Sequence, residues 1–252
     1  MKTLQIVFSP TGGTQKVVDI LSEGLGGMVE KLDLTNKDLK ETALSPEDIA
    51  VIAVPSYGGR VPALAAQRLG NIQGNQAKCL LVCVYGNRAY EDTLIELKDL
   101  AEQFGFQPVA AIAAIAEHSI LHQYAAGRPN QKDREQLLEF AGKVIEKLQQ
   151  KPVPGISAIP GNHPYKKAGG GGMVPKADKN CTQCGLCADN CPAQAINRET
   201  LEVTDAKECI SCMRCVVNCP QSARKVNSLM LSAASVALKK ACSEYKENEL
   251  FL

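Results

Sequence analysis

The stretch Cys181-Thr-Gln-Cys184-Gly-Leu-Cys187-Ala-Asp-Asn-Cys191-Pro192 decides how the C-terminal part of this 252-residue chain folds. The same pattern recurs 28 residues later as Cys209-Ile-Ser-Cys212-Met-Arg-Cys215-Val-Val-Asn-Cys219-Pro220. All eight cysteines and both prolines keep the same register in the two copies. A repeat this regular indicates two copies of one structural unit.

The spacing within each copy predicts a [4Fe-4S] site. Cysteines at i, i+3 and i+6 wrap a tight loop around one corner of a cubane cluster and supply three thiolates. The proline after the fourth cysteine directs the chain away, so the fourth thiolate ligates the other cluster. Cluster I is therefore expected to use Cys181, Cys184, Cys187 and Cys219. Cluster II is expected to use Cys209, Cys212, Cys215 and Cys191. Such a unit carries electrons one at a time.

Two other uses of these cysteines are less consistent with the pattern. Four-cysteine zinc sites present two separated Cys-x-x-Cys pairs per metal ion, whereas each copy here has a triad followed by Cys-Pro. A disulfide framework requires an oxidising compartment. Met1 leads directly into the short apolar run Leu4 to Phe8, without the features of a signal peptide, so we expect a cytoplasmic protein.

The overall composition excludes some classes of partner. The formal net charge is +1, which provides no field to gather nucleic acid or an anionic membrane. No apolar run reaches the roughly 18 residues that a membrane-spanning helix needs. Hydrophobic content of 45% is ordinary for a globular protein, and the length fits one large domain and one small one. The sequence leaves the oligomeric state open.

The first 150 residues alternate short apolar runs with helical segments, which is typical of a doubly wound parallel α/β sheet. The expected strands are Thr3 to Phe8, Met28 to Leu34, Ile49 to Pro55, Lys78 to Tyr85 and Pro108 to Ala116. The expected helices are Thr14 to Leu25, Pro62 to Leu69, Tyr90 to Phe104 and Gln131 to Gln150. We predict a domain at 1–150, a Pro/Gly-rich linker at 151–173, a small α+β domain at 174–227 and a C-terminal helix at 228–252.

Three loops at the carboxyl ends of these strands are candidates for a ligand site. The first, Ser9-Pro10-Thr11-Gly12-Gly13-Thr14, precedes a helix, whose free amides and dipole attract a phosphate. It also fits a plain glycine turn with Thr14 as the N-cap residue. The other two loops are 55–60 and 85–92. The chain has neither a dinucleotide-binding fingerprint nor a P-loop, so direct reduction by NAD(P)H is not indicated.

Together these loops resemble the flavodoxin family over residues 1–150. The resemblance implies the strand order 2-1-3-4-5 and FMN as the ligand. The phosphate would be held by Ser9, Thr11, Gly12, Gly13 and Thr14. The isoalloxazine ring of FMN would be flanked by Pro55, Ser56, Tyr57, Gly58, Gly59, Arg60, Tyr85, Gly86, Asn87, Arg88 and Tyr90. Tyr57 or Tyr90 would stack on the ring, and Arg60 or Arg88 would place positive charge near it.

The segment 174–226 resembles the bacterial two-cluster ferredoxins, and the whole chain resembles the flavodoxin–ferredoxin fusion proteins of anaerobes. The leading interpretation is an iron–sulfur flavoprotein that passes electrons between FMN and a redox partner, such as a ferredoxin or a low-potential reductase. The alternative is an FMN-dependent reductase of a small molecule, for example a quinone or nitro compound. A weaker third interpretation is an oxygen sensor, although no basic helix-turn-helix is present.

Four further residues stand out. His118, in the long segment 117–130, is a weak candidate for proton transfer beside the flavin, and a structural role is the other interpretation. Cys79 and Cys83 lie in an apolar strand and are expected to be buried. Cys242 has no assigned role.

Overall fold

A computed structural model describes residues 2–169 and 172–252. Met1 of the predicted first domain and residues 170–171 of the predicted linker lie outside the described residues. No helix of the described part is long and apolar enough to cross a bilayer.

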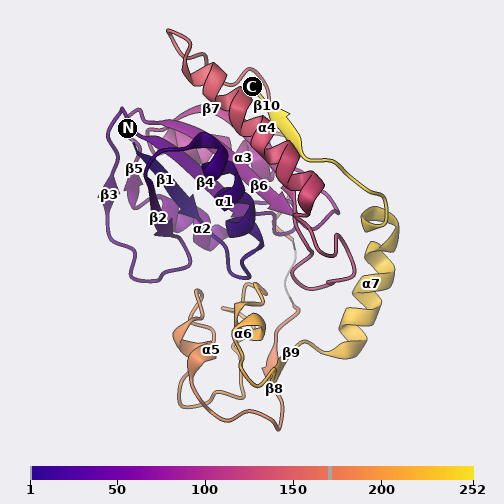
Figure 1. Cartoon of the computed structure of the whole chain (residues 1–252). Helices are drawn as coiled ribbons and strands as arrows, with labels where there is room; N and C mark the ends of the chain where they lie inside the picture. The colour runs from indigo at the N-terminus through magenta and orange to yellow at the C-terminus, as the bar shows by residue number, and fades with distance from the viewer. Residues whose placement is uncertain (1, 170–171) are drawn as a thin grey trace.

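A six-stranded sheet forms the N-terminal domain (Figure 1). Its strands lie in the order β10-β7-β6-β4-β1-β2, and the five in the N-terminal domain are parallel. Counted along the chain, these five have the predicted order 2-1-3-4-5. The strands are β1 (Thr3–Val7), β2 (Val29–Asp33), β4 (Ile49–Pro55), β6 (Lys78–Tyr85), β7 (Gln107–Ile115) and β10 (Glu249–Phe251). Two short strands that the sequence did not predict, β3 (Thr42–Ala43) and β5 (Ile72–Gln73), pair beside the main sheet.

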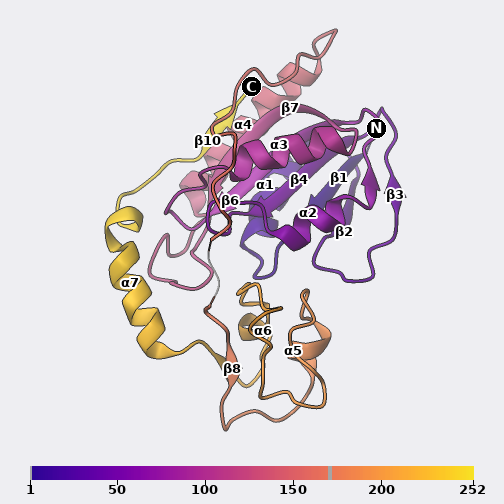
Figure 2. The ribbon, with the colours of Figure 1, turned by 180° about the vertical axis from the view of Figure 1, so that it is seen from behind.

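Helices cover both faces of this sheet, as the unbroken apolar runs of its central strands require (Figures 1 and 2). Alternate side chains of each strand enter opposite cores, so Ile52 packs in one core and Val51 in the other. The helices are α1 (Gly13–Leu25) and α4 (Gln131–Leu148) on one face, and α2 (Ala63–Leu69) and α3 (Thr93–Gln103) on the other. Cys79 and Cys83 are buried in the core, as predicted.

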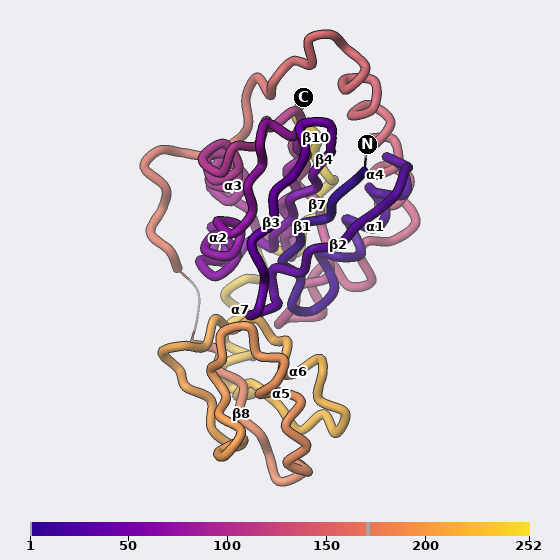
Figure 3. Tube along the Cα trace, turned by 90° about the vertical axis from the view of Figure 1, so that its left-hand side faces the viewer, coloured from indigo at the N-terminus to yellow at the C-terminus, as the bar shows by residue number. Residues whose placement is uncertain are grey.

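The C-terminal unit lies beyond the carboxyl ends of the parallel strands (Figures 1 and 3). It contains a short antiparallel pair, β8 (Lys176–Ala177) and β9 (Arg224–Lys225), and two single-turn helices. The helices, α5 (Leu186–Asp189) and α6 (Arg214–Val217), begin at equivalent positions of the two cysteine repeats. This small α+β unit has the architecture predicted for residues 174–227.

The last 25 residues differ from the predicted C-terminal helix. Helix α7 (Ser228–Cys242) ends well before the terminus, and the chain then returns to the sheet as β10, antiparallel to β7. Asn248 fixes this return, because its Oδ1 accepts the N–H of Ile115 at 2.8 Å while its Nδ2 donates to Asp133 at 3.0 Å. The prediction missed β10 because three residues at a chain end carry no periodic signal.

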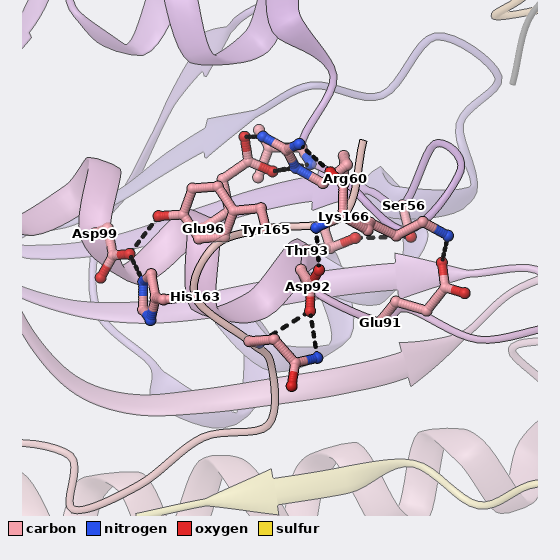
Figure 4. Close-up of polar contacts among 12 residues, drawn as sticks. Ser56, Arg60, Glu91, Asp92, Thr93, Glu96, Asp99, His163, Tyr165 and Lys166 are labelled. Atoms are coloured by element: carbon pink, nitrogen blue, oxygen red, sulfur yellow. Dashed lines mark hydrogen bonds and ion pairs between the residues drawn. The ribbon is translucent and has the colours of Figure 1, made fainter. Parts of the chain in front are cut away.

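The described part of the Pro/Gly-rich segment, residues 151–169, forms a strap that contacts α3 (Figure 4). Asp92, at the N-cap of α3, accepts the backbone N–H groups of Asn162 at 2.9 Å and of Lys166 at 2.7 Å. Asp99 accepts hydrogen bonds from His163 and Tyr165. Proline and glycine therefore exclude a helix here without making the described part of the segment free of contacts.

Removal of the buried Asp133 carboxylate is expected to destabilise the protein. Asp133 and Arg128 are almost fully buried, and Arg128 Nε donates to Asp133 Oδ2 at 2.9 Å. D133N leaves the Arg128 cation unpaired, which typically costs about 3–5 kcal/mol. Chemical denaturation should therefore show a clearly lower midpoint. E139Q, which breaks the exposed Glu139–Lys143 pair, is the control and should change stability by about 0.5 kcal/mol or less.

The Asp133 carboxylate should also make the stability of the folded protein sensitive to acid. Burial alone would raise the pKa of Asp133, but hydrogen bonds from Arg128, Asn130 and Asn248 lower it below its usual value. Because the folded pKa lies below the unfolded one, this stabilisation is complete above about pH 4 and is lost progressively at lower pH. The difference in stability between wild type and D133N should shrink over that acidic range. A difference that stays constant would contradict the assignment.

Candidate functional site

A cavity of about 320 Å³ lies at the carboxyl ends of the parallel strands. The loops that follow β1, β4 and β6 form its walls, as the sequence predicted for a ligand site. Its volume is near the lower end of the range for small-molecule sites, about 300–1,000 Å³.

The first loop presents the N-terminus of α1 to the cavity. Thr11, Gly13 and Thr14 line it. Gly12 is the N-cap residue, with φ of 88°, a left-handed conformation that glycine adopts without strain. Thr14 is therefore not the N-cap, and Gly12 provides no capping side chain, which leaves the amides of Gly13 and Thr14 suited to an anion. Ser9 and Gly12 do not line the cavity; Ser9 Oγ instead accepts the N–H of Gln15 at 2.9 Å.

The loop after β4 requires its two glycines. Pro55, Ser56, Tyr57, Gly58 and Gly59 all line the cavity. A Cβ atom on Gly58 would lie 1.9 Å from the carbonyl oxygen of Gly169, and one on Gly59 would lie 1.8 Å from the Glu91 carboxylate. Close approach of the strap and of the third loop therefore excludes side chains at both positions.

Arg60 points away from the cavity, contrary to its predicted place beside the ring (Figure 4). Its Nε and Nη2 donate to the Glu96 carboxylate at 2.7 and 2.8 Å. Its Nη1 donates to the Lys166 carbonyl at 2.6 Å, and the guanidinium lies 4.8 Å from the centre of the Tyr165 ring. Arg60 therefore holds the strap to α3.

The loop after β6 contributes only part of its predicted set. Tyr85, Gly86 and Arg88 line the cavity, and Arg88 pairs with Glu91 at 2.7 Å. Asn87 and Tyr90 do not line it. Asn87 is buried and donates to the carbonyls of Cys242 and Glu244, and the Tyr90 hydroxyl donates to Glu249 at 2.9 Å. Both residues therefore attach the chain that follows α7.

His118 also lines the cavity. Its Nδ1 accepts the backbone N–H groups of Ile120 and Leu121, each at 3.2 Å. Burial lowers the pKa of His118, and the two donors at Nδ1 assign the proton of the neutral ring to Nε2. The ring packs so closely that a Cβ on Gly86 would lie 2.7 Å from His118 Cβ. A role in catalysis stays a prediction.

Sequence reasoning missed the elements that close the cavity from the other side. Ala234 and Leu238 of α7 line it, as do Ile210 and Ser211 of the second cysteine repeat. Only the apolar spacing of α7 gave a signal, and that spacing does not identify what the helix covers. Cys242, which had no predicted role, is the last residue of α7. It is buried in a small apolar core with Leu121 and Tyr124.

Two smaller cavities in the C-terminal unit are each lined by four cysteines. The first cysteine set consists of Cys181, Cys184, Cys187 and Cys219. The second cysteine set consists of Cys191, Cys209, Cys212 and Cys215. Each set combines one triad with the fourth cysteine of the other copy, the arrangement predicted from the repeat. Among the described residues, no three His, Cys, Asp or Glu side chains converge closely enough to hold a single metal ion; the cysteines instead surround each cavity.

The second cysteine set adjoins the large cavity. Burial raises the pKa of Tyr57, which lines the large cavity, well above its usual value, and the neighbouring Cys212 adds to this rise. Ile210 packs against the same hydrophobic core as Tyr57. Arg68, buried on α2, donates from Nη2 to the Pro192 carbonyl at 2.6 Å and from Nη1 to the Leu34 carbonyl at 2.8 Å. The two units are therefore packed together around this edge.

Residues 180–224 match the family model described as a 4Fe-4S dicluster domain. The five parallel strands have the flavodoxin-like order β2-β1-β4-β6-β7. The chain therefore joins a sheet of flavodoxin-like strand order to a segment that matches a 4Fe-4S dicluster domain. A search of curated protein sequences found no match to this chain.

Several solved structures are similar to the N-terminal part of the chain. Flavodoxin 1 from Bacillus cereus is 15% identical, with 58% of this chain and 98% of that chain covered and a TM-score of 0.43. A flavodoxin from the domain Archaea is 13% identical, with 60% and 100% covered and a TM-score of 0.43. Rubredoxin oxygen:oxidoreductase from Desulfovibrio gigas is 16% identical, with 59% and 37% covered and a TM-score of 0.42. The fold assignment itself rests on the strand order.

Loss of the Thr14 hydroxyl should weaken FMN binding and leave the iron content unchanged. Thr14 is buried and lines the cavity, so T14V removes one donor to a phosphate without changing the side-chain shape. A hydrogen bond to a charged group is worth about 1.5–3 kcal/mol, which corresponds to a Kd roughly 10- to 150-fold higher. Titration of flavin-free protein with FMN, followed by fluorescence quenching, measures this change.

T14S is the matched control, because it retains the hydroxyl and should bind FMN nearly as well as the wild type. Iron and acid-labile sulfide should each stay at about eight atoms per chain in both variants. Equal FMN affinity in T14V and wild type would contradict the phosphate assignment, and zinc in place of iron would contradict the assignment of the cysteines.

Proposed function

We propose that this protein is an iron–sulfur flavoprotein that transfers electrons between a low-potential redox partner and FMN through two [4Fe-4S] clusters. One observation carries the proposal. Ile210 and Ser211, which lie between two cysteines of the second cysteine set, also line the cavity expected to bind FMN. The same short loop therefore belongs to both sites.

The residues present fit the two clusters. Four cysteines line each small cavity, and the two sets are related by the sequence repeat. The N–H of Ala195 donates to Cys191 Sγ and the N–H of Ala223 donates to Cys219 Sγ, both at 3.3 Å. Amide donors to sulfur stabilise the anionic, thiolate-bound state and tune its potential. These equivalent contacts support an anionic group at both sites.

The large cavity fits FMN. The N-terminus of α1 offers the amides of Gly13 and Thr14 to a phosphate, and Thr11 and Thr14 offer hydroxyls. Tyr57 and Tyr85 offer aromatic surface. Arg88 supplies a positive charge, partly neutralised by Glu91. When bound, FMN would couple two-electron chemistry with the one-electron chemistry of the clusters.

The lining of the cavity favours an electron carrier over a small-molecule reductase. Leu238 of α7, Ile210 of the cysteine repeat and Met173 all line it. Segments outside the sheet domain therefore form part of the wall beside a bound flavin. A quinone or nitro reductase would instead need free space over the isoalloxazine ring.

The first cysteine set provides the exposed end of the electron path. Cys184 is exposed, whereas Cys212 of the second set is only 8% exposed. Leu186 lines the cavity of the first set and is 42% exposed. We therefore assign the surface around Cys184 and Leu186 to the redox-protein partner. The cytoplasmic location predicted from the sequence belongs to the same proposal.

Anaerobic reduction of the holoprotein by a reduced low-potential ferredoxin tests this function. The flavin absorbance should bleach once the clusters are reduced, and T14V without FMN should accept only the electrons that its clusters hold. A flavin that stays oxidised would contradict the proposal. Rapid reoxidation by an added quinone or nitro compound, at turnover rates, would favour the reductase instead.

L186E tests the partner surface. A charge placed on this exposed apolar surface should slow reduction by the ferredoxin, whereas reduction by dithionite, a small ion, should be unchanged. V203E is the matched control, because Val203 is exposed on the same unit and lines neither cysteine cavity. Equal effects of L186E and V203E would place the partner elsewhere.

A further inference from the structure

Arg224, the first residue of β9, is an almost fully buried arginine, with 2% of its surface exposed. Its Nη1 donates to Thr204 Oγ1 at 2.7 Å and to the Pro175 carbonyl at 3.3 Å. Its Nη2 donates to the Leu201 carbonyl and lies 3.5 Å from Cys187 Sγ. Arg224 and Leu201 both line the cavity of the first cysteine set.

This buried cation has no carboxylate partner among the residues that the structure describes. Its recorded hydrogen bonds go to two carbonyls, one hydroxyl and one sulfur. A buried charge is expensive unless an opposite charge lies close to it. The group in contact with it that would become anionic is the thiolate of Cys187, as a ligand of an iron–sulfur cluster.

The repeat provides an internal comparison. Arg224 lies five residues after Cys219, and the residue five after Cys191 is Ile196. Ile196 is buried and lines the cavity of the second cysteine set. The two sites therefore differ at equivalent positions, one occupied by a buried cation and the other by an apolar side chain.

A second arginine, Arg214, lines the cavity of the second set, so that site also has a positive charge nearby. Arg214 is only half-buried, and water screens its charge more than that of Arg224. Arg224 is the arginine that contacts a cysteine sulfur through its side chain.

We propose that Arg224 is the internal counter-ion of the first cluster and raises its reduction potential. This inference rests on the proposed function, because it requires the clusters. Each one-electron reduction adds negative charge to a group that is already anionic, and a buried cation in contact with that group favours the added charge. Arg224 thereby makes the surface-exposed cluster a better acceptor for an electron arriving from the partner.

Anaerobic redox titration of the holoprotein, followed by electron paramagnetic resonance, tests the role of Arg224. R224Q should lower the midpoint potential of the first cluster and change the midpoint potential of the second cluster less. R224K keeps the charge and should stay closer to the wild type. C184S, which alters a ligand of the first set alone, identifies the signal of that cluster.

The neighbouring residue of β9 supplies a matched control. Lys225 is exposed and pairs with Asp178 at 2.7 Å, so K225Q removes one surface charge from the same strand and should leave both potentials unchanged. If R224Q fails to retain iron, R224M fills the same space without charge and should give the same lower potential.

Three results would overturn the inference while leaving the proposed function intact. These are an unshifted potential in R224Q or R224M with both clusters present, an equal shift in K225Q, and a shift in R224K as large as in R224Q. Wild-type protein without iron–sulfur signals would instead contradict the proposed function itself.

Discussion

The hydrogen bond from the buried Arg68 guanidinium to the Pro192 carbonyl connects the sheet domain to the C-terminal unit. The position of the second cysteine set beside the large cavity depends on this connection. Pro192 directly follows Cys191, a member of the second cysteine set. Arg68 also holds the Leu34 carbonyl at the end of β2, so one side chain links the sheet to a cysteine loop. Ile210, which lies between Cys209 and Cys212 of that set, packs against the core of the sheet domain. The second cysteine set is therefore fixed against the large cavity.

Contacts of the two flanking segments hold the small unit in that place. On one side the strap follows α3, where Asp92 and Asp99 accept its backbone and side-chain donors. On the other side α7 leads back to β10, which Asn248 joins to the sheet. A unit of this size buries too little apolar surface to be strongly stable alone. The contacts at its two ends supply part of the constraint that a larger core would otherwise provide, and the proposed crossed clusters would supply the rest.

The chemistry-bearing positions were predictable where they depend on local spacing. The cysteine sets follow from i, i+3, i+6 repeats, and the cavity follows from loops at the ends of parallel strands. Side-chain direction was not predictable. Three predicted residues lie in the expected loops but point to partners in other segments. Arg60 donates to Glu96, Asn87 to the Cys242 carbonyl and Tyr90 to Glu249. The closure of the cavity by α7 depends on contacts between units, which leave no periodic signal in the sequence.

The central claim is that electrons pass between the clusters and FMN within one chain. Flash reduction of the clusters in the FMN-loaded holoprotein, followed by the rate at which the flavin absorbance bleaches, tests it most directly. A fixed contact between the second cysteine set and the cavity predicts a rate that does not change with protein concentration. A rate that rises in proportion to concentration would show transfer between molecules and would contradict the account.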